Sequence, residues 1–281
     1  MSGARTAIEF VRVADGVFVA RTQPLDVNVT VVLGDDAALV IDTLSTDAQA
    51  TALLAGVRDL TGLPLTVLNT HFHFDHCFGN AVVAAGGRPI FAHENTVAEL
   101  SEHGSHWQRR WHADYADTDP TLANGLAAVQ IKVPDHVVRG TAHLDLGGRT
   151  VTMTHPGHAH TYGDLYAYID DVDVLVAGDL VEESGPPDFG DAHPLEWPGS
   201  VGSMLRVATP ATLIVPGHGV PVDVEFVARQ QADLAAFAWL IRDGHRDGAT
   251  VDSITARAPW AGVRVGVERG YATLDAHPNT P

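Results

Sequence analysis

The sequence contains few of the residues that define several large classes of protein. Its 281 residues include one cysteine, Cys77, and one lysine, Lys132. A single cysteine excludes an internal disulfide framework and gives no reason to expect an oxidising compartment. No apolar run approaches the length of a membrane span, and the opening MSGARTAIEF lacks the apolar stretch of a signal peptide. We therefore expect a cytoplasmic protein with no membrane partner.

Positive charge is also scarce. The chain has 17 Lys and Arg residues against 35 Asp and Glu residues, which gives a formal net charge of −18. A chain this acidic repels a phosphate backbone, so we expect no nucleic-acid partner. A small-molecule substrate is the expected partner, and a homodimer is left open.

The hydrophobic content is sufficient for one compact unit. Hydrophobic residues make up 45% of the chain, with five Trp and nine Phe. We predict one domain over residues 1–275, built from two similar halves at about 1–140 and 141–250, and a loose tail at 276–281.

Apolar periodicity predicts strands and helices in two similar batches. Expected strands cover residues 8–13, 17–20, 27–33, 38–41, 65–68, 142–146, 151–154, 164–169, 174–176 and 213–215, and expected helices begin near Thr46, Thr96 and Asp223. The helix near Thr96 carries Trp107, Trp111 and Tyr115 at helical spacing, a stripe more typical of core than of a ligand site. This alternation favours two sheets packed face to face with helices outside.

A cluster of ligand-type side chains follows the strand predicted at 65–68. The segment His71-Phe72-His73-Phe74-Asp75-His76 has the pattern His-x-His-x-Asp-His. Four such side chains within six residues would be poorly solvated if buried without a cation, so a metal is the economical explanation. The segment is therefore predicted to bind metal, and two adjacent ions fit its spacing.

Further ligand candidates follow in order along the chain, each near the end of a predicted strand. They are His160 in His155-Pro156-Gly157-His158-Ala159-His160-Thr161-Tyr162-Gly163-Asp164, Asp179 in Ala177-Gly178-Asp179, and His218 in Pro216-Gly217-His218-Gly219. Flanking glycines allow the backbone to approach a crowded site. Each alone is weak evidence, but their joint presence supports a site with two metals.

These motifs resemble those of the metallo-β-lactamase superfamily. The family order is a strand-end Asp, His-x-His-x-Asp-His, a His, an Asp and a final His, matched here by Asp42, residues 71–76, His160, Asp179 and His218. The resemblance covers roughly residues 10–245 and implies an α/β fold, the αββα four-layer sandwich. It also implies one metal at His71, His73 and His160, a second at Asp75, His76 and His218, and Asp179 between them.

Two assignments within this resemblance have alternatives. His158 competes with His160 for the third motif, but the family continuation His-Thr-x-Gly-polar follows His160, so we assign His160 and place His158 near the site. By resemblance, Asp42 lies beneath the site and orients a ligand, and the alternative is a plain strand-end turn. We also expect Tyr162, His193 and Trp197 beside the site or its pocket.

The predicted reaction is metal-dependent hydrolysis. Two close zinc ions, or manganese ions, lower the pKa of a bridging water and polarise a carbonyl oxygen, so no Ser or Cys nucleophile is needed. Asp75 and Asp179 are the candidates for orienting that water and moving its proton. The expected substrate is an ester, lactone, thioester or lactam.

The substrate is constrained by departures from known branches of the family. True β-lactamases of the superfamily usually carry another residue where this chain has Asp179, so weak or promiscuous β-lactamase activity is an alternative only. A C-terminal helical domain like that of glyoxalase II would have little room in this chain, because only one clear long helix is predicted after His218. The irregular segment from Glu182 to Pro198 is expected to wall the pocket, and a purely structural loop is the alternative.

Two other classes share the motif set. A persulfide dioxygenase of the same fold would use one iron held by His71, His160 and Asp179. A binding or scaffold protein would use the ions for stability alone.

Overall fold

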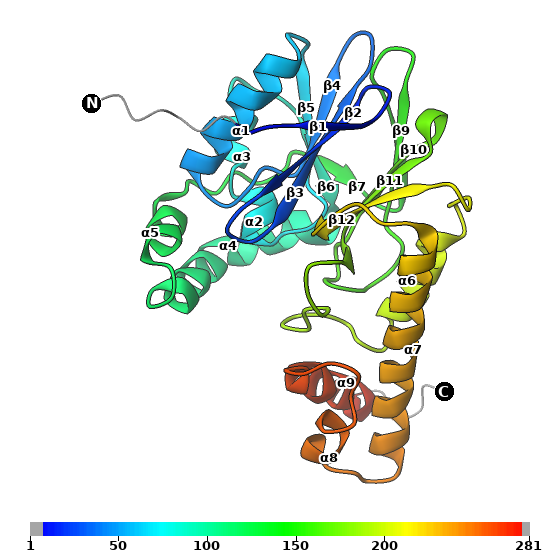
Figure 1. Ribbon diagram of the computed structural model, residues 1–281. Helices are drawn as coiled ribbons and strands as arrows, with labels where there is room; N and C mark the ends of the chain where they lie inside the picture. Colours follow the sequence, from blue (N-terminus) through cyan, green and yellow to red (C-terminus); the bar gives the residue numbers. More distant parts are fainter. Residues whose placement is uncertain (1–7, 277–281) are drawn as a thin grey trace.

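The computed structural model describes residues 8–276 and is a mixed α/β structure (Figure 1). The strands are β1 (Val11–Ala14), β2 (Val17–Thr22), β3 (Val27–Leu33), β4 (Ala38–Ile41), β5 (Leu65–Leu68), β6 (Ile90–His93), β7 (His136–Val138), β8 (Thr141–Asp145), β9 (Thr150–Thr154), β10 (Tyr166–Ile169), β11 (Val174–Glu182) and β12 (Leu213–His218). Of the tail predicted at 276–281, Ala276 is the last residue of α9, and residues 277–281 lie outside the described residues.

Helices surround these strands. They are α1 (Asp47–Leu60), α2 (Phe74–Cys77), α3 (Asn80–Val83), α4 (Glu94–Tyr115), α5 (Pro120–Ala128), α6 (Trp197–Leu205), α7 (Val224–Arg246), α8 (Val251–Thr255) and α9 (Arg264–Ala276), with a 3₁₀ turn η1 (Asp170–Val172). None of the helices within residues 8–276 combines the length and the apolar character needed to cross a bilayer.

The strands form one hydrogen-bonded path whose two halves meet at β3 and β12. The order is β7-β6-β5-β4-β3-β12-β11-β10-β9-β8, with β2 on β3 and β1 on β2. At the junction His218 pairs with Val27. Beside it, the Asn28 side-chain amide donates to the carbonyls of Pro216 (2.9 Å) and Gly219 (2.8 Å). These contacts bring the end of β12, and the histidine that it carries, against the N-terminal half.

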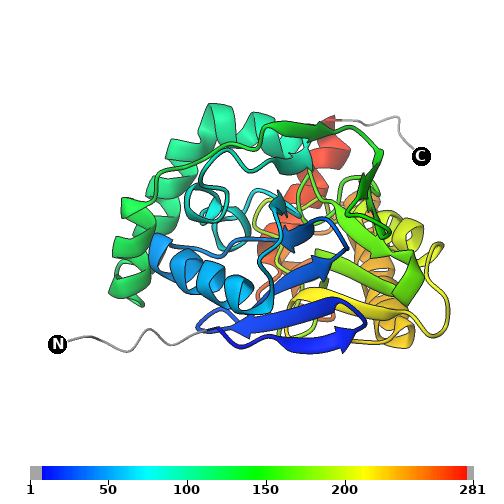
Figure 2. The ribbon, with the colours of Figure 1, turned by 90° about the horizontal axis from the view of Figure 1, so that it is seen from above.

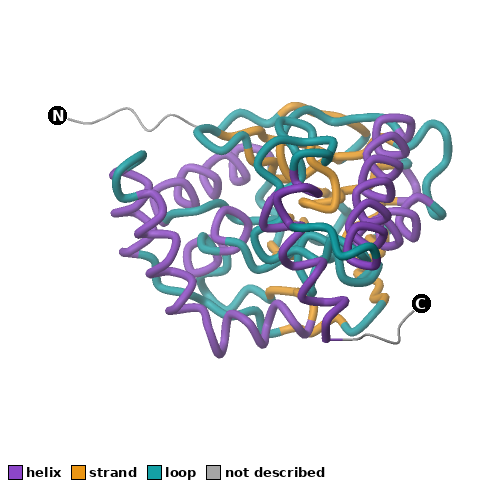
Figure 3. Tube along the Cα trace, turned by 90° about the horizontal axis from the view of Figure 1, so that it is seen from below, coloured by secondary structure: helices purple, strands orange, loops and turns teal. Residues whose placement is uncertain are grey.

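The two halves pack face to face, with helices on both outer faces (Figures 2 and 3). A central core joins Leu39 and Leu68 of the first half to Met153 and Val215 of the second. A separate cluster packs α1 against β3, β4 and β5, and another packs α6 and α7 against β11 and β12. The predicted αββα sandwich is therefore confirmed.

Several elements were absent from the prediction. Pro120 begins α5, where the Asp119 carboxylate caps Leu122 N–H (3.0 Å). The one clear long helix expected after His218 is α7, and the shorter α8 and α9 that follow it were not predicted. Glycines lower the helical propensity of α9, yet a Cβ at Gly270 would lie 2.6 Å from Ile241 on α7. Close packing of two helices, rather than propensity, accounts for the glycine.

His93 links β6 to α4, and its hydrogen bond to α4 requires a neutral imidazole ring. Its Nδ1 accepts a hydrogen bond from Asn95 N–H (3.3 Å) at the start of α4, which requires an unprotonated nitrogen. The ring stacks on His155 with centroids 3.9 Å apart. Burial, and then the neighbouring His155, lower the pKa of His93 from 6.5 to about 4.

We predict that acid destabilises the protein through His93. Because the folded-state pKa is depressed, the stabilisation is present above pH 6.5 and is lost as the pH falls from 6.5 toward 4. Asn at this position keeps a helix cap and cannot titrate. Urea unfolding of the native chain should therefore lose up to about 2 kcal/mol more than His93→Asn between about pH 7.5 and pH 4.5.

The control is His103→Asn, which changes an exposed histidine on α4. Its pH dependence should follow that of the native chain. Parallel stability curves for the native chain and His93→Asn would contradict the proposed protonation.

Candidate metal centre

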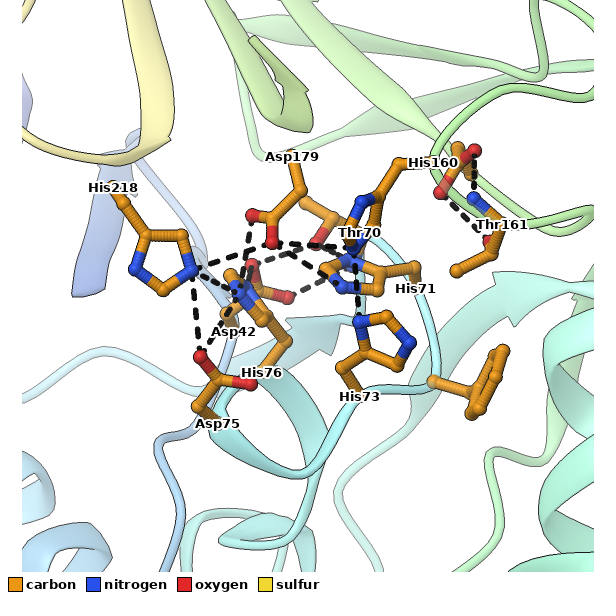
Figure 4. A network of polar contacts seen from close by, with 12 residues as sticks. Asp42, Thr70, His71, His73, Asp75, His76, His160, Thr161, Asp179 and His218 are labelled. Atoms are coloured by element: carbon orange, nitrogen blue, oxygen red, sulfur yellow. Dashed lines mark hydrogen bonds and ion pairs between the residues drawn. The ribbon is translucent and has the colours of Figure 1, made fainter. Parts of the chain in front are cut away.

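Four segments deliver the candidate ligands to one place (Figure 4). Residues 71–76 follow β5 and enter α2, so the short helix turns Asp75 and His76 toward the same centre as His71. His160 comes from the loop before β10, Asp179 lies within β11, and His218 ends β12. Since β11 and β12 are parallel, their last residues lie at one edge.

A first group consists of His71, His73, His160 and Asp179, whose ligand atoms lie within 4.8 Å of one another. His160 Nε2 is 2.9 Å from His73 Nδ1 and 3.4 Å from Asp179 Oδ2. His71 Nε2 is 3.7 Å from the same carboxylate oxygen. Three imidazole nitrogens and a carboxylate therefore point at a common volume.

A second group consists of Asp75, His76 and His218. His218 Nε2 lies 3.4 Å from Asp75 Oδ2 and 3.3 Å from Asp179 Oδ2, and His76 Nε2 lies 3.2 Å from Asp179 Oδ1. Both carboxylate oxygens of Asp179 thus approach this group, and Oδ2 also approaches the first. Asp179 is the side chain that the two groups share.

Asp42 lies beneath the cluster and holds two of its members. Its carboxylate accepts hydrogen bonds from Thr70 N–H, from the Thr70 hydroxyl and from His76 Nδ1–H, each at 2.8 Å. The Thr70 oxygen in turn lies 3.1 Å from His71 Nδ1. With its hydroxyl hydrogen committed to Asp42, Thr70 accepts from His71 Nδ1–H. Asp42 therefore occupies the place below the site that the resemblance implied.

The rings of His73 and His218 are also held from outside the cluster. His73 Nε2 lies 3.0 Å from Asp191 Oδ1, and His218 Nδ1 lies 2.7 Å from the carbonyl of Leu25. A nitrogen that donates to an oxygen leaves the other nitrogen of a neutral imidazole unprotonated. In His71, His73, His76 and His218 that other nitrogen faces the centre, as a metal ligand requires.

Electrostatics and burial fit a cation at this position. Burial, followed by the charge of His76, lowers the pKa of His71 well below 6.5. Burial opposes ionisation of Asp179, yet His76, His218 and other histidines hold its pKa well below 3.8. Among the described residues, buried His71 Nε2 and Asp179 Oδ1 have no hydrogen-bond partner. Unpartnered donor atoms of this kind are costly in a protein interior and are the atoms a divalent ion would satisfy.

Gly217 shows why a glycine precedes the last histidine. A Cβ at this position would lie 1.7 Å from Asp179 Oδ1. Any side chain would therefore displace the shared carboxylate, because the β11 and β12 backbones approach closely here.

His158 and His193 do not face the ligand cluster. The His158 ring is exposed and lies 3.3 Å from Glu196, while His193 packs beside it at a centroid separation of 4.7 Å. The chain turns sharply, with Ala159 N–H donating to the carbonyl of Thr161 (2.8 Å), and His158 and His160 enter different side-chain groups. Of the two candidates for the third motif, His160 is the one that the fold brings to the cluster.

Tyr162 and Trp197 lie one layer behind the cluster. Tyr162 donates to Glu99 through its hydroxyl. Trp197 is fully buried, donates to the carbonyl of Leu180 (3.2 Å) and packs its ring edge-on to His160 at 5.6 Å. Neither residue lines the cavity above the site, so neither has the pocket position that was one of the two expected places. Trp197 supports His160 through packing.

A cavity of about 610 Å³ opens above the cluster. Its floor holds His73, Asp75, His160, Asp179 and His218. One part of its wall is aromatic, and another part comes from residues 184–191, so the irregular segment does wall the pocket as we expected. The aromatic wall comprises Phe74, Trp107, Trp111 and Tyr115. The stripe on α4 packs into a core cluster as predicted but also faces the cavity, which its helical spacing did not reveal.

Sequence reasoning missed Asp191 and Glu182. Asp191 holds His73 from 118 residues away, and Arg269 of α9 holds its loop by donating to the carbonyls of Asp191 (2.7 Å) and Ala192 (2.6 Å). Burial, and then the nearby Asp179, raise the pKa of Glu182 well above 4.5, which favours its protonated form. No local motif marks either residue; the acidic content of the 182–191 segment was the one signal available.

Comparison with known proteins places this geometry in a family. The sequence model of the metallo-β-lactamase superfamily matches residues 22–218. A protein of Bacillus subtilis (strain 168) named probable metallo-hydrolase YqgX is 25% identical over 205 residues, which cover 72% of this chain and 89% of the relative. A metallo-β-lactamase type 2 of Bacillus cereus is 29% identical over 85 residues, 29% of this chain and 33% of the relative.

Solved structures agree on the fold. A metallo-β-lactamase from Pontibacter korlensis superposes with a TM-score of 0.67 at 19% identity, covering 81% of this chain and 98% of that one. The DIM-1 metallo-β-lactamase gives a TM-score of 0.66 at 20% identity, covering 83% of this chain and 98% of that one. The chain therefore belongs to the metallo-β-lactamase superfamily, a family of metal-dependent hydrolases.

Proposed function

We propose that the protein is a dinuclear zinc hydrolase that cleaves an ester, thioester, lactone or lactam. The observation that carries this proposal is the sharing of Asp179 between two complete ligand groups. His71, His73 and His160 would hold one ion, and Asp75, His76 and His218 the other. A mononuclear site would leave Asp75, His76 and His218 buried together without a cation to offset their crowding.

The bound ions would supply an activated water near neutral pH and polarise the carbonyl oxygen of the substrate. The chain itself contributes orientation and proton handling. The carboxylates of Asp75 and Asp179 face the cavity between the two ligand groups, where each can accept a proton from water and pass it to a leaving group. Asp42, the Leu25 carbonyl and Asp191 keep the imidazole rings in the tautomers that bind metal.

The first prediction of this proposal concerns metal content. Elemental analysis of the purified protein should find about two zinc or manganese ions per chain. Asp179→Ala removes the shared ligand and should lower the content of both ions, and His71→Ala should lower at least one. His143→Ala, which changes an exposed histidine of β8, is the matched control and should retain both ions.

A single iron per chain would contradict the dinuclear hydrolase and agree with a persulfide dioxygenase instead. Full metal content in Asp179→Ala would contradict the ligand assignment.

The second prediction concerns activity. The zinc-loaded protein should hydrolyse at least one member of a panel of uncharged esters, thioesters, lactones and β-lactams, and a chelator should abolish that activity. Asp179→Ala should lower kcat/KM by at least about 100-fold, because it removes both a ligand and a proton acceptor. Absence of turnover across the panel at full metal content would favour a scaffold role.

The third prediction separates the two ion sites through the residues behind them. Asp191 holds one ring of the first group, whereas Asp42 holds His76 directly and His71 through Thr70. Asp191→Ala should therefore weaken one ion about 10–100-fold in a chelator competition, and Asp42→Asn should weaken both. Asn suits position 42 because the backbone there has φ = 68°, which Asn tolerates better than most residues.

Equal loss of both ions in Asp191→Ala would contradict this division. Circular dichroism of each metal-free variant checks that the fold is intact.

A further inference from the structure

The aromatic wall of the cavity consists of rings that pack against one another. Trp107 and Trp111 stack at a centroid separation of 5.3 Å, and Phe74 contacts Trp111 (5.2 Å) and Tyr115 (5.6 Å). The His73 ring lies 5.8 Å from Trp111, so the wall begins beside the metal ligands. A group attached a few bonds from the scissile carbonyl would therefore meet these rings.

The wall already carries a cation. The Arg110 guanidinium lies over the Trp107 ring, 5.1 Å from its centroid. Asp114, one turn further along α4, lies 3.8 Å from the guanidinium. The negative face of an aromatic ring attracts a positive charge, most strongly for Trp. Trp111 and Tyr115 continue the same wall into the cavity and leave room for a second positive group.

The ionisable side chains that line the cavity are mostly acidic. Apart from the candidate metal ligands, they include four carboxyl groups, Asp114, Glu182, Asp188 and Asp191, against one cation, Arg110. No Lys or second Arg from residues 8–276 lines this cavity. A substrate carboxylate, such as that of a β-lactam antibiotic, would meet no free cation away from the metal centre.

Three of these carboxyl groups are offset by their surroundings. Asp114 lies beside Arg110, and Asp191 holds His73. Glu182 is buried at the end of β11, where its side chain lies within 4.8 Å of the candidate ligand His218.

Asp188 is the fourth carboxylate, whose charge is not offset in this way. It is exposed on the 184–191 loop, lines the same cavity as the aromatic wall, and accepts a hydrogen bond from Gly190 N–H (3.0 Å). Burial, and then the charges of Asp75 and Asp188, raise the pKa of Tyr115. A carboxylate and aromatic rings that line one cavity can together stabilise a cation bound among them.

We propose that the cavity selects substrates bearing a positively charged group, such as a quaternary ammonium, which lies between Trp111, Tyr115 and Asp188 while the carbonyl lies at the metal centre. This inference rests on the proposed hydrolase function. It distinguishes the protein from enzymes whose substrates are anionic at neutral pH. The expected order of preference is cationic, then neutral, then anionic.

Three matched thioesters test the order. They are the S-butyryl esters of thiocholine, of its uncharged isostere 3,3-dimethylbutane-1-thiol, and of the anionic 2-mercaptoethanesulfonate, with released thiol measured by a colorimetric reagent. The zinc-loaded protein should show a kcat/KM for the cationic ester about tenfold above that for the neutral ester, with the anionic ester lowest.

Substitutions locate the selectivity. Asp188→Asn and Trp111→Leu should each lower the cationic-to-neutral ratio of kcat/KM by about threefold or more. The matched control is Asp233→Asn, which removes an equal charge from an exposed position on α7 outside the cavity and should keep the native ratio. A ratio near one in the native protein, or an anionic ester hydrolysed fastest, would overturn the proposal.

A binding measurement keeps the inference separate from the hydrolase function. Benzyltrimethylammonium should quench the tryptophan fluorescence of the zinc-loaded native protein at millimolar concentration, and its affinity should fall at least threefold in Asp188→Asn but not in Asp233→Asn. Binding without hydrolysis of any thioester, or of any member of the ester, lactone and β-lactam panel, would contradict the hydrolase and retain the cation site. Hydrolysis without charge preference, or no saturable quenching, would contradict the cation site alone.

Discussion

The buried carboxylate of Asp42 is the contact on which the geometry of the centre depends. It accepts three hydrogen bonds from two neighbours, one of which is a candidate ligand and the other of which supports a second. An ionised carboxylate is expensive to bury unless such donors compensate it. Because those donors are the Thr70 backbone, its hydroxyl and the His76 ring, the compensation also sets the direction of the chain that follows β5. Asp42, directly after β4, therefore sets the orientation of the cluster at 71–76.

Hydrogen bonds of the same kind come from parts of the chain far from the motifs. The Leu25 carbonyl holds His218, and Asp191 holds His73 from a loop that Arg269 of α9 ties down. Each outer contact fixes a proton on one ring nitrogen and thereby frees the other for the centre. The C-terminal helices thus contribute to the metal centre without supplying a ligand to it.

The floor and the walls of the cavity consist of residues with different proposed roles. The floor gathers the residues that belong to the family, and these explain the likeness to metallo-β-lactamases and to a probable metallo-hydrolase. The walls come from α4 and from the 184–191 loop, which carry aromatic and acidic side chains. The proposed reaction and the proposed substrate preference therefore rest on different segments, and likeness in the floor does not by itself establish likeness in the walls.

The sequence by itself determined the features that depend on short-range order. His-x-His-x-Asp-His lies within six residues after a strand, and periodicity located β3, β4, β5 and α1 because their apolar faces repeat locally. Between His158 and His160 the sequence offered only the resemblance to the family, and the tertiary structure placed His160 in the cluster, since a sharp turn rather than a regular repeat sets the directions of the two side chains. The tertiary structure alone brought Asp191 to His73 and turned the α4 stripe toward a cavity. Contacts across more than a hundred residues leave no periodic trace in the chain, because they depend on how separate segments pack in space.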